Sequence, residues 1–216
     1  MRIFLLTALT MAAFAANSVL TRLALVDGDM DVASFGALRL GAGALVLVGM
    51  CLWAGRRMHF FSVERIPGVF GLLLYVAGFT AAYLGMDAGL GALLLFGTVQ
   101  VTMFAGAALH REVLPMLRVV GAGIAFVGLL YLVWPWQTIA QSAINVVMMV
   151  LAGVGWGLYS LVGKGSKDAL ADTAVNFCGA ALVFPVVIWA LMGDAQISMT
   201  GRGVALAVSS GAGTSG

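Results

Sequence analysis

Apolar residues run along the chain in long blocks that are separated by short polar connections. A helix needs about 20 largely apolar residues to cross the hydrocarbon core of a bilayer. The pattern therefore predicts membrane-spanning helices at residues 3–26, 32–54, 66–86, 90–109, 114–134, 143–163 and 174–193, with an eighth that begins near Val204. The fold class expected from this pattern is an all-α integral membrane protein.

The composition agrees with a chain that is solvated by lipid. Hydrophobic residues make up 62% of the 216 residues and charged residues 9%, whereas soluble domains carry about 25% charged residues. So few charges cannot cover a surface that faces water. The net charge of +2 is scattered over short loops and forms no basic patch, so nucleic acid is excluded as a partner and membrane lipids are expected instead.

Part of the first apolar segment recurs 142 positions later in the chain. Residues 14–22 (FAANSVLTR) resemble residues 156–164 (WGLYSLVGK): both begin with an aromatic residue and end with a basic one, and Ser18 matches Ser160. An internal repeat in a protein with many membrane spans is typical of secondary transporters.

Five predicted helices precede the second copy, and an odd number places that copy upside down in the membrane. We therefore expect inverted repeats of five transmembrane helices, the first at residues 1–136 and the second, incomplete, at residues 141–216. After Arg202 only about ten apolar residues follow, which are too few to cross a bilayer. The chain is thus expected to cover seven helices and part of an eighth.

The basic residues of the loops predict the orientation in the membrane. If the N-terminus is cytoplasmic, only Arg202 lies in an external loop. The cytoplasmic segments then hold Arg2, Arg56, Arg57, Arg65, Arg111, Lys164 and Lys167. This excess follows the positive-inside rule, so the sequence predicts a multi-pass protein of the cytoplasmic (inner) membrane with a cytoplasmic N-terminus.

Two arginines lie inside apolar segments, near the predicted outer surface. Arg22 lies about one turn from the outer end of the first helix, and Arg39 lies about 10 Å deep in the second, at 1.5 Å per residue. No Asp or Glu occurs within an apolar segment to pair with them. Charged groups inside membranes usually face a protein interior or a water-filled cavity. We expect a cationic vestibule for a carboxylate or phosphate of the substrate; snorkelling of Arg22 and carbonyl or helix-end contacts of Arg39 are the alternatives.

Polar and aromatic side chains at related depths complete the predicted substrate site. Asn17 and Ser18 precede the first of these arginines, and the matching stretch of the second copy contributes aromatic side chains. An amide near the middle of the fourth segment must also find a partner. The candidate substrate-binding residues are Asn17, Ser18, Arg22, Arg39, Gln100, Trp156 and Tyr159. Hydrogen bonding between helices explains the same polar residues equally well.

Small residues four positions apart allow the backbones of two membrane helices to approach closely. The chain contains three such pairs, which are Gly153 with Gly157, Ala37 with Gly41, and Gly121 with Ala125. We expect each pair to lie at a contact between helices.

The sequence contains no motif for enzymatic chemistry. It lacks both H-E-x-x-H and G-x-S-x-G, and its two histidines, His59 and His110, fall in predicted cytoplasmic loops. Its two cysteines, Cys51 and Cys178, lie within apolar segments and have no metal-ligand spacing. We therefore expect a protein that is not an enzyme and that uses no cofactor and no metal.

Three stretches of the chain resemble the EamA-type members of the drug/metabolite transporter superfamily. They are residues 14–25, residues 34–40 (SFGALRL) and residues 110–114 (HREVL), the last followed by Gly121 and Gly128. Their order and spacing fit over the whole chain. The resemblance implies ten helices in two inverted five-helix repeats, a central cavity with alternating access, and movement of small metabolites without ATP.

The resemblance also bears on three charged residues. Arg22, Arg39 and Glu112 fall at positions that the family tends to keep charged, and Glu112, in a cytoplasmic turn, is expected to be structural. One departure concerns length, since a ten-helix family member continues beyond the eighth helix.

These observations together predict a secondary transporter that moves a small polar or amphipathic metabolite, anionic or zwitterionic, across the cytoplasmic membrane. Two alternatives stay open: a membrane-embedded enzyme that acts on lipid, and a non-transporting scaffold or truncated fragment. The expected partners are the metabolite and membrane lipids, and a homodimer is left open.

Overall fold

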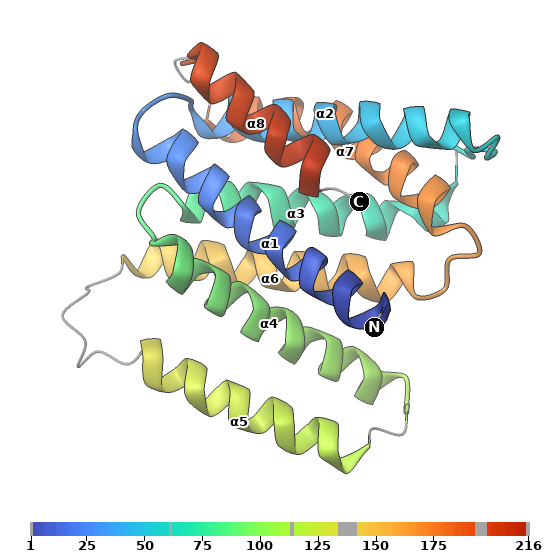
Figure 1. The fold of residues 1–216 in the computed structure, drawn as a ribbon, viewed down its shortest axis with the longest axis vertical. Coiled ribbons are helices and arrows are strands. Elements are labelled where there is room, and N and C mark those ends of the chain that lie inside the picture. The colour runs from blue at the N-terminus through green and yellow to red at the C-terminus, as the bar shows by residue number, and fades with distance from the viewer. Residues whose placement is uncertain (1, 61, 113–114, 134–141, 193–197, 215–216) are drawn as a thin grey trace.

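A computed structural model describes residues 2–60, 62–112, 115–133, 142–192 and 198–214. These residues form eight α-helices and one short 3-10 helix (Figure 1). The elements are α1 (Arg2–Val26), α2 (Val32–Trp53), η1 (Val63–Arg65), α3 (Ile66–Ala82), α4 (Ala88–Leu109), α5 (Met116–Val133), α6 (Ala143–Gly163), α7 (Ala169–Met192) and α8 (Gly201–Thr214). Six of them are long and apolar enough to cross a membrane. The prediction of an all-α, multi-pass membrane protein is confirmed at this level.

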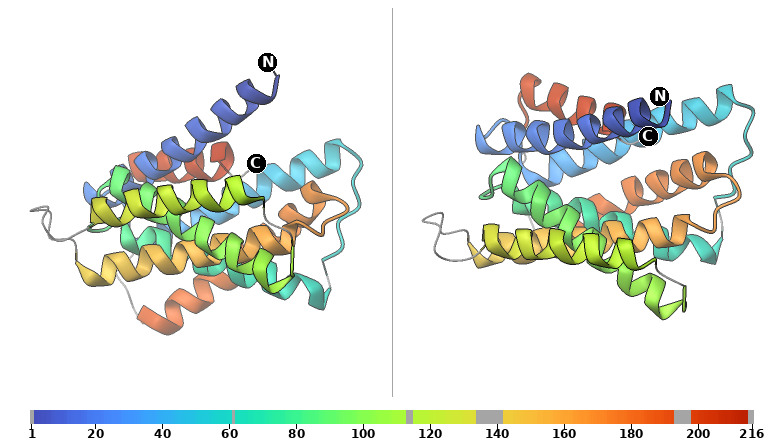
Figure 2. Two further views of the ribbon diagram at one scale, coloured as in Figure 1. Left: turned by 90° about the horizontal axis from the view of Figure 1, so that it is seen from below. Right: turned by 60° about the horizontal axis from the view of Figure 1, so that its bottom comes forward.

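Successive helices alternate in direction, so their ends gather at two opposite faces of the bundle (Figure 1). The N-terminus lies at the same face as the C-terminal ends of α2, α4 and α6, which we call the N-terminal face. α5 lies at one edge, beside α4, and the first half of α1 projects from the bundle (Figure 2). The side chains of residues 4–12 in that half are exposed, as expected for a helix surface that contacts lipid.

The helix bounds differ from the predicted spans by more than three residues at two places. α7 begins at Ala169, five residues before the predicted start at 174, because the Asp168 carboxylate accepts a hydrogen bond from the Ala171 N–H (3.3 Å) and caps the helix. α3 ends at Ala82, whereas the predicted span continued to residue 86. The predicted boundary between the two repeats, at residues 136–141, lies outside the described residues.

Glycines let α6 pack closely against two neighbours. A Cβ atom at Gly155 would lie 2.6 Å from the carbonyl oxygen of Gly71 and 2.6 Å from the backbone nitrogen of Tyr75, so α3 and α6 touch through their backbones. Cβ atoms at Gly153 and Gly157 would lie 2.5 and 2.6 Å from the side chains of Thr98 and Thr102 of α4. The predicted packing role of the Gly153–Gly157 pair is therefore confirmed.

The other two small-residue pairs behave differently. A Cβ atom at Gly41 or Gly121 would meet no heavy atom within 4 Å among the residues that the structure describes. Neither glycine therefore lies at a close helix contact within this part of the chain, although Ala37 packs against the buried core. Further helix contacts join α1 to α8 and α2 to both α7 and α8.

The end of α4 is tied to the end of α6 at the N-terminal face. Arg111 adopts a left-handed backbone conformation (φ 54°), and the Glu112 N–H donates to the carbonyl of Ala107 (2.9 Å), which closes the last turn of α4. This turn places the Glu112 carboxylate 3.1 Å from the Lys164 ammonium just beyond α6. Glu112 thus makes a structural contact at the surface.

Replacing Gly155 with alanine tests the backbone contact between α3 and α6. The added methyl group has no room, so the helices must separate, and we expect a loss of about 1–3 kcal/mol of stability. Gly163→Ala is the matched control on the same helix, because a methyl group there would meet no heavy atom of the described residues within 4 Å and alanine favours the helix. Thermal unfolding in detergent should show a lower melting temperature for Gly155→Ala alone; equal values would contradict the contact.

Candidate functional site

Arg39 is buried at the centre of the bundle, with 6% of its surface exposed. Its Nη2 donates a hydrogen bond to the Tyr75 hydroxyl (2.8 Å), and its guanidinium lies 5.1 Å from the ring centre of Tyr75 and 5.0 Å from that of Phe79. Its Nη1 is buried without a hydrogen-bond partner among the described residues. In the same part of the chain no carboxylate forms an ion pair with it. The faces of two aromatic rings and one phenol hydroxyl therefore stabilise the positive charge of Arg39.

A polar network from four helices surrounds this guanidinium. The Tyr75 hydroxyl on α3 also accepts a hydrogen bond from the Asn17 amide on α1 (3.2 Å). The Ser210 hydroxyl on α8 donates to the Asn17 carbonyl oxygen (2.7 Å). We call Asn17, Arg39, Tyr75 and Ser210 the central cluster. All four side chains are buried, so helices from both ends of the chain meet through polar groups at this point.

Aromatic rings form a wall on the other side of Tyr75. The Trp156 ring on α6 lies 4.8 Å from Tyr75, 5.4 Å from Tyr159 and 6.1 Å from Phe14, measured between ring centres. Between this wall and the central cluster is a cavity of about 10 Å³. It is lined by Phe14, Asn17, Ser18, Tyr75, Phe79, Leu95, Phe96 and Trp156. A cavity of this size holds at most one water molecule.

The structure brings five of the seven predicted site residues together. Asn17 and Arg39 belong to the central cluster, and Ser18 and Trp156 line the small cavity. Tyr159 stacks on Trp156 and directs its hydroxyl to Thr173 (3.2 Å). Arg22 and Gln100 lie elsewhere.

Arg22 has a structural position at the end of α3. Its Nη1 donates to the Tyr83 carbonyl (2.8 Å), and its Nη2 lies 3.8 Å from the exposed Asp87 carboxylate. A cation favours the C-terminal end of a helix, where carbonyl groups lack partners. Arg22 therefore makes the helix-end contact that had been considered for Arg39, and it does not join Arg39 in one vestibule.

Gln100 is exposed and lines a groove of about 510 Å³ between α4 and α5. The groove is built mainly of apolar residues such as Val101, Phe104 and Phe126. It is separate from the central cluster, so Gln100 is placed apart from the other candidates.

Three residues of the site, Tyr75, Phe79 and Ser210, were not among the predicted candidates. Tyr75 and Phe79 are four positions apart and share one face of α3 with Tyr83, and their rings stack in sequence. This aromatic spacing was visible in the sequence and could have identified them. Ser210 had no such pattern, because it lies in a short apolar stretch and gains its role only when α8 packs on α1.

A second cavity, of about 210 Å³, opens at the N-terminal face between α3, α6 and α7. Arg65 and Asp172 form an ion pair at its wall (2.6 Å), and Ser166 donates to the same carboxylate (2.6 Å). Asn176, 7% exposed, lines the cavity with a buried carbonyl oxygen that has no partner among the described residues. Across that part of the chain no three His, Cys, Asp or Glu side chains lie close enough to hold a metal ion.

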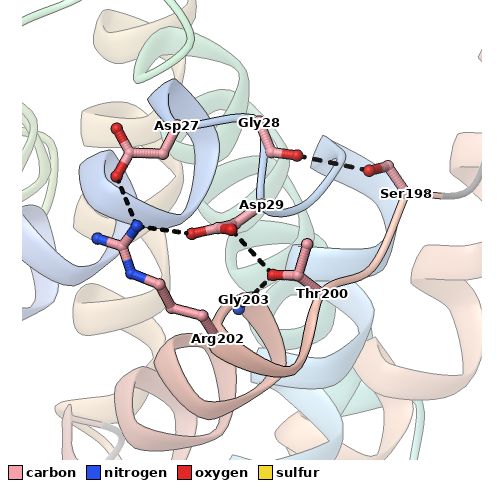
Figure 3. A network of polar contacts seen from close by, with 7 residues as sticks. All are labelled: Asp27, Gly28, Asp29, Ser198, Thr200, Arg202 and Gly203. Atoms are coloured by element: carbon pink, nitrogen blue, oxygen red, sulfur yellow. Dashed lines mark hydrogen bonds and ion pairs between the residues drawn. The ribbon is translucent and has the colours of Figure 1, made fainter.

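The opposite face is closed by contacts between the α1–α2 loop and the start of α8 (Figure 3). Arg202 lies 2.9 Å from the Asp27 carboxylate and 3.1 Å from that of Asp29; the second contact is an ion pair without hydrogen-bond geometry. The Thr200 hydroxyl donates to Asp29 (2.9 Å) and accepts from the Gly203 N–H (3.0 Å), which caps α8. Two loops far apart in sequence are thus joined.

Asp31 adds a further contact at this face. Its carboxylate accepts hydrogen bonds from the backbone N–H groups of Ser34 and Ser198, both 3.0 Å. Burial by itself would raise the pKa of Asp31, but these hydrogen bonds outweigh burial and hold the pKa below its ordinary value. Asp31 is therefore ionised at neutral pH and both caps α2 and fixes the neighbouring loop.

Comparisons with known proteins were made at the level of sequence and of fold. No family model matches the chain. An uncharacterized protein of Pseudomonas aeruginosa is 42% identical over 215 residues, which cover 100% of this chain and 74% of that protein. One solved crystal structure matches with a TM-score of 0.65 at 19% identity, covering 97% of this chain and 76% of the other. The latter match shows a shared fold alone.

Replacing Tyr75 with phenylalanine tests the support of the buried charge. The variant keeps the ring but removes the oxygen that accepts from Arg39 and Asn17, so we expect a loss of about 2 kcal/mol. Tyr159→Phe removes one partly buried hydrogen bond and is the matched control. Thermal unfolding in detergent should give a clearly lower melting temperature for Tyr75→Phe. A drop no larger than that of the control would contradict the role of this hydroxyl.

Proposed function

The chain belongs to the same family as the Pseudomonas aeruginosa protein, and we propose that it is a secondary transporter, which moves a small anionic or zwitterionic metabolite across the cytoplasmic membrane without ATP. The observation that carries the proposal is the buried Arg39. A charge inside a membrane protein is costly unless it has a partner, and such charges usually mark substrate or ion pathways.

The surroundings of Arg39 support an anionic group as the missing partner. Its Nη1 is left without an acceptor among the described residues, while Tyr75 and Asn17 offer further polar contacts beside it. A guanidinium binds a carboxylate or phosphate through two parallel hydrogen bonds. The rings of Phe14 and Trp156 on the other side of the cluster suit an apolar part of the same substrate.

The packing of the helices supports the inverted-repeat architecture of EamA-type carriers. If α1, α2 and α3 correspond to α6, α7 and α8, the contact of α3 with α6 corresponds to that of α8 with α1. The contact of α2 with α8 likewise corresponds to that of α7 with α3. The contact between α2 and α7 corresponds to itself, because these two helices exchange places. All of these pairs are in contact. Such symmetry lets one bundle rock against the other around a central site.

The mechanism follows from the position of the central cluster. It lies between the two faces, beside a cavity that is too small for a substrate in this conformation. Helices around it must separate on one side at a time, so that Arg39 faces water first on one side and then on the other. In the proposed orientation the N-terminal face is cytoplasmic, since most loop Lys and Arg residues are there.

Transport by reconstituted protein tests the proposal. The probes are radiolabelled zwitterionic amino acids and small monocarboxylates, with the uncharged amide of any transported compound as comparator. We expect Arg39→Ala to lower the initial rate at least about tenfold, because a charge-assisted hydrogen bond is lost, and Arg39→Lys to retain part of it. Arg57→Ala, in an exposed loop, is the control. Full transport by Arg39→Ala, or equal transport of the amide, would contradict the role of Arg39.

The orientation is tested with single cysteines in a Cys51→Ala, Cys178→Ala background. A membrane-impermeant maleimide added to intact cells should label the Asp87→Cys variant and leave the Arg57→Cys variant unlabelled until the cells are opened. The two positions lie at opposite faces of the bundle, at the start of α4 and just after α2. The reverse labelling pattern would show that the N-terminus is external.

A further inference from the structure

At each of the two faces of the bundle an arginine forms an ion pair with one or two aspartates from another part of the chain. At the opposite face, Arg202 in the first turn of α8 pairs with Asp27 and Asp29, which precede α2 (Figure 3). We call this set, with Thr200, the outer latch. At the N-terminal face, Arg65 at the start of α3 pairs with Asp172 in the first turn of α7. We call this pair, with Ser166, the inner latch.

The arginines of the two latches occupy corresponding places in the chain, although the aspartates that pair with them do not. Arg202 follows Arg65 by 137 positions, and Asp168, the cap of α7, follows Asp31, the cap of α2, by the same number. The ends of α1 and α6, and the starts of α2 and α7, also lie 137 positions apart. Each latch therefore joins the N-terminal end of a third helix to residues in or just before the first turn of a second helix, once at each face.

The two sides are closed to different degrees. At the outer side the backbones of α2 and α8 touch: a Cβ atom at Gly211 would collide with the Arg39 carbonyl, and one at Gly203 would lie 2.7 Å from the Asp29 carbonyl. At the inner side α3 and α7 meet mainly through side chains, such as Asn176 beside Gly68, and leave the cavity of about 210 Å³. The inner latch forms part of the wall of that cavity.

We propose that the two latches are reciprocal gates: the outer latch holds the path to Arg39 shut from outside, the inner latch holds it shut from the cytoplasm, and each opens only while the other is formed. The inference rests on the proposed transport function and adds the residues that control its two conformations. An ion pair stabilises only the state in which it is formed, so breaking one latch shifts the population toward the state open on that side.

The gates are tested by the accessibility of a buried reporter. Ala207 on α8 is fully buried between the outer surface and Ser210. In the Cys51→Ala, Cys178→Ala background, a membrane-impermeant thiol reagent is added from outside to vesicles of known orientation that carry Ala207→Cys. Arg202→Ala should raise the labelling rate about fivefold, the upper range for partly exposed ion pairs. Arg65→Ala should lower it, because it favours the inward-open state.

Asp87→Asn is the matched control, since this carboxylate lies at the same face but pairs with Arg22 and not with the latch. It should leave the labelling rate unchanged. If the two arginines had a merely structural role, Arg202→Ala and Arg65→Ala would not change the labelling rate in opposite directions. Equal increases in both variants would indicate general loosening and would overturn the proposal, as would no change in either.

A disulfide lock gives a second test that does not depend on removing a charge. Met30 and Met199 face each other in an antiparallel bridge between the latched loops, where Cα atoms are about 4.5–5.5 Å apart, within disulfide range. Oxidised Met30→Cys/Met199→Cys protein should lose transport of the amino-acid or monocarboxylate probe, and dithiothreitol should restore it. Unchanged transport in the oxidised form would overturn the gate. Absence of transport in wild-type protein would instead count against the proposed function, and the labelling test would still be interpretable.

Discussion

The arrangement of the centre depends on one interaction, the bond between the buried Arg39 guanidinium and the Tyr75 hydroxyl. A charge at this depth must be compensated, and among the described residues the compensation comes from aromatic faces and neutral polar groups. The Tyr75 hydroxyl can accept a hydrogen bond from Arg39 only if α2 lies against α3. It can accept one from Asn17 only if α1 also lies against α3. Satisfying one guanidinium therefore constrains three helices at once.

Close backbone contact makes this arrangement rigid enough to hold a polar centre. Where α3 meets α6, Gly71 and Gly155 leave no space for a side chain, and Trp156, next to Gly155, is thereby set against Tyr75. Membrane helices gain little from the hydrophobic effect against each other, so packing and interhelical hydrogen bonds must supply the association. The bundle combines both at the same level, with glycines on one side of Tyr75 and the polar cluster on the other.

Sequence reasoning identified part of the site because polar groups inside apolar segments are rare and visible. Asn17, Ser18, Arg39 and Trp156 were found in this way and do lie around one centre. Arg22 and Gln100 satisfied the same criterion, but depth along a helix does not say which way a side chain points. Arg22 faces the end of α3 and Gln100 faces the groove beside α5. Ser210 could not be found, since its partner Asn17 is 193 positions away.

Hydropathy and composition alone predicted the fold class and most of the helix bounds, because lipid requires apolar blocks of fixed length whatever the packing. A match between residues 142 positions apart also predicted two related halves. Only the tertiary structure indicated how the two predicted halves align, since the helix ends and their aspartate caps correspond at a spacing of 137 positions. It also decided which ions pair across each face. Such pairings depend on the rotation of each helix about its axis, which is set by contacts between distant segments and leaves no mark in local sequence.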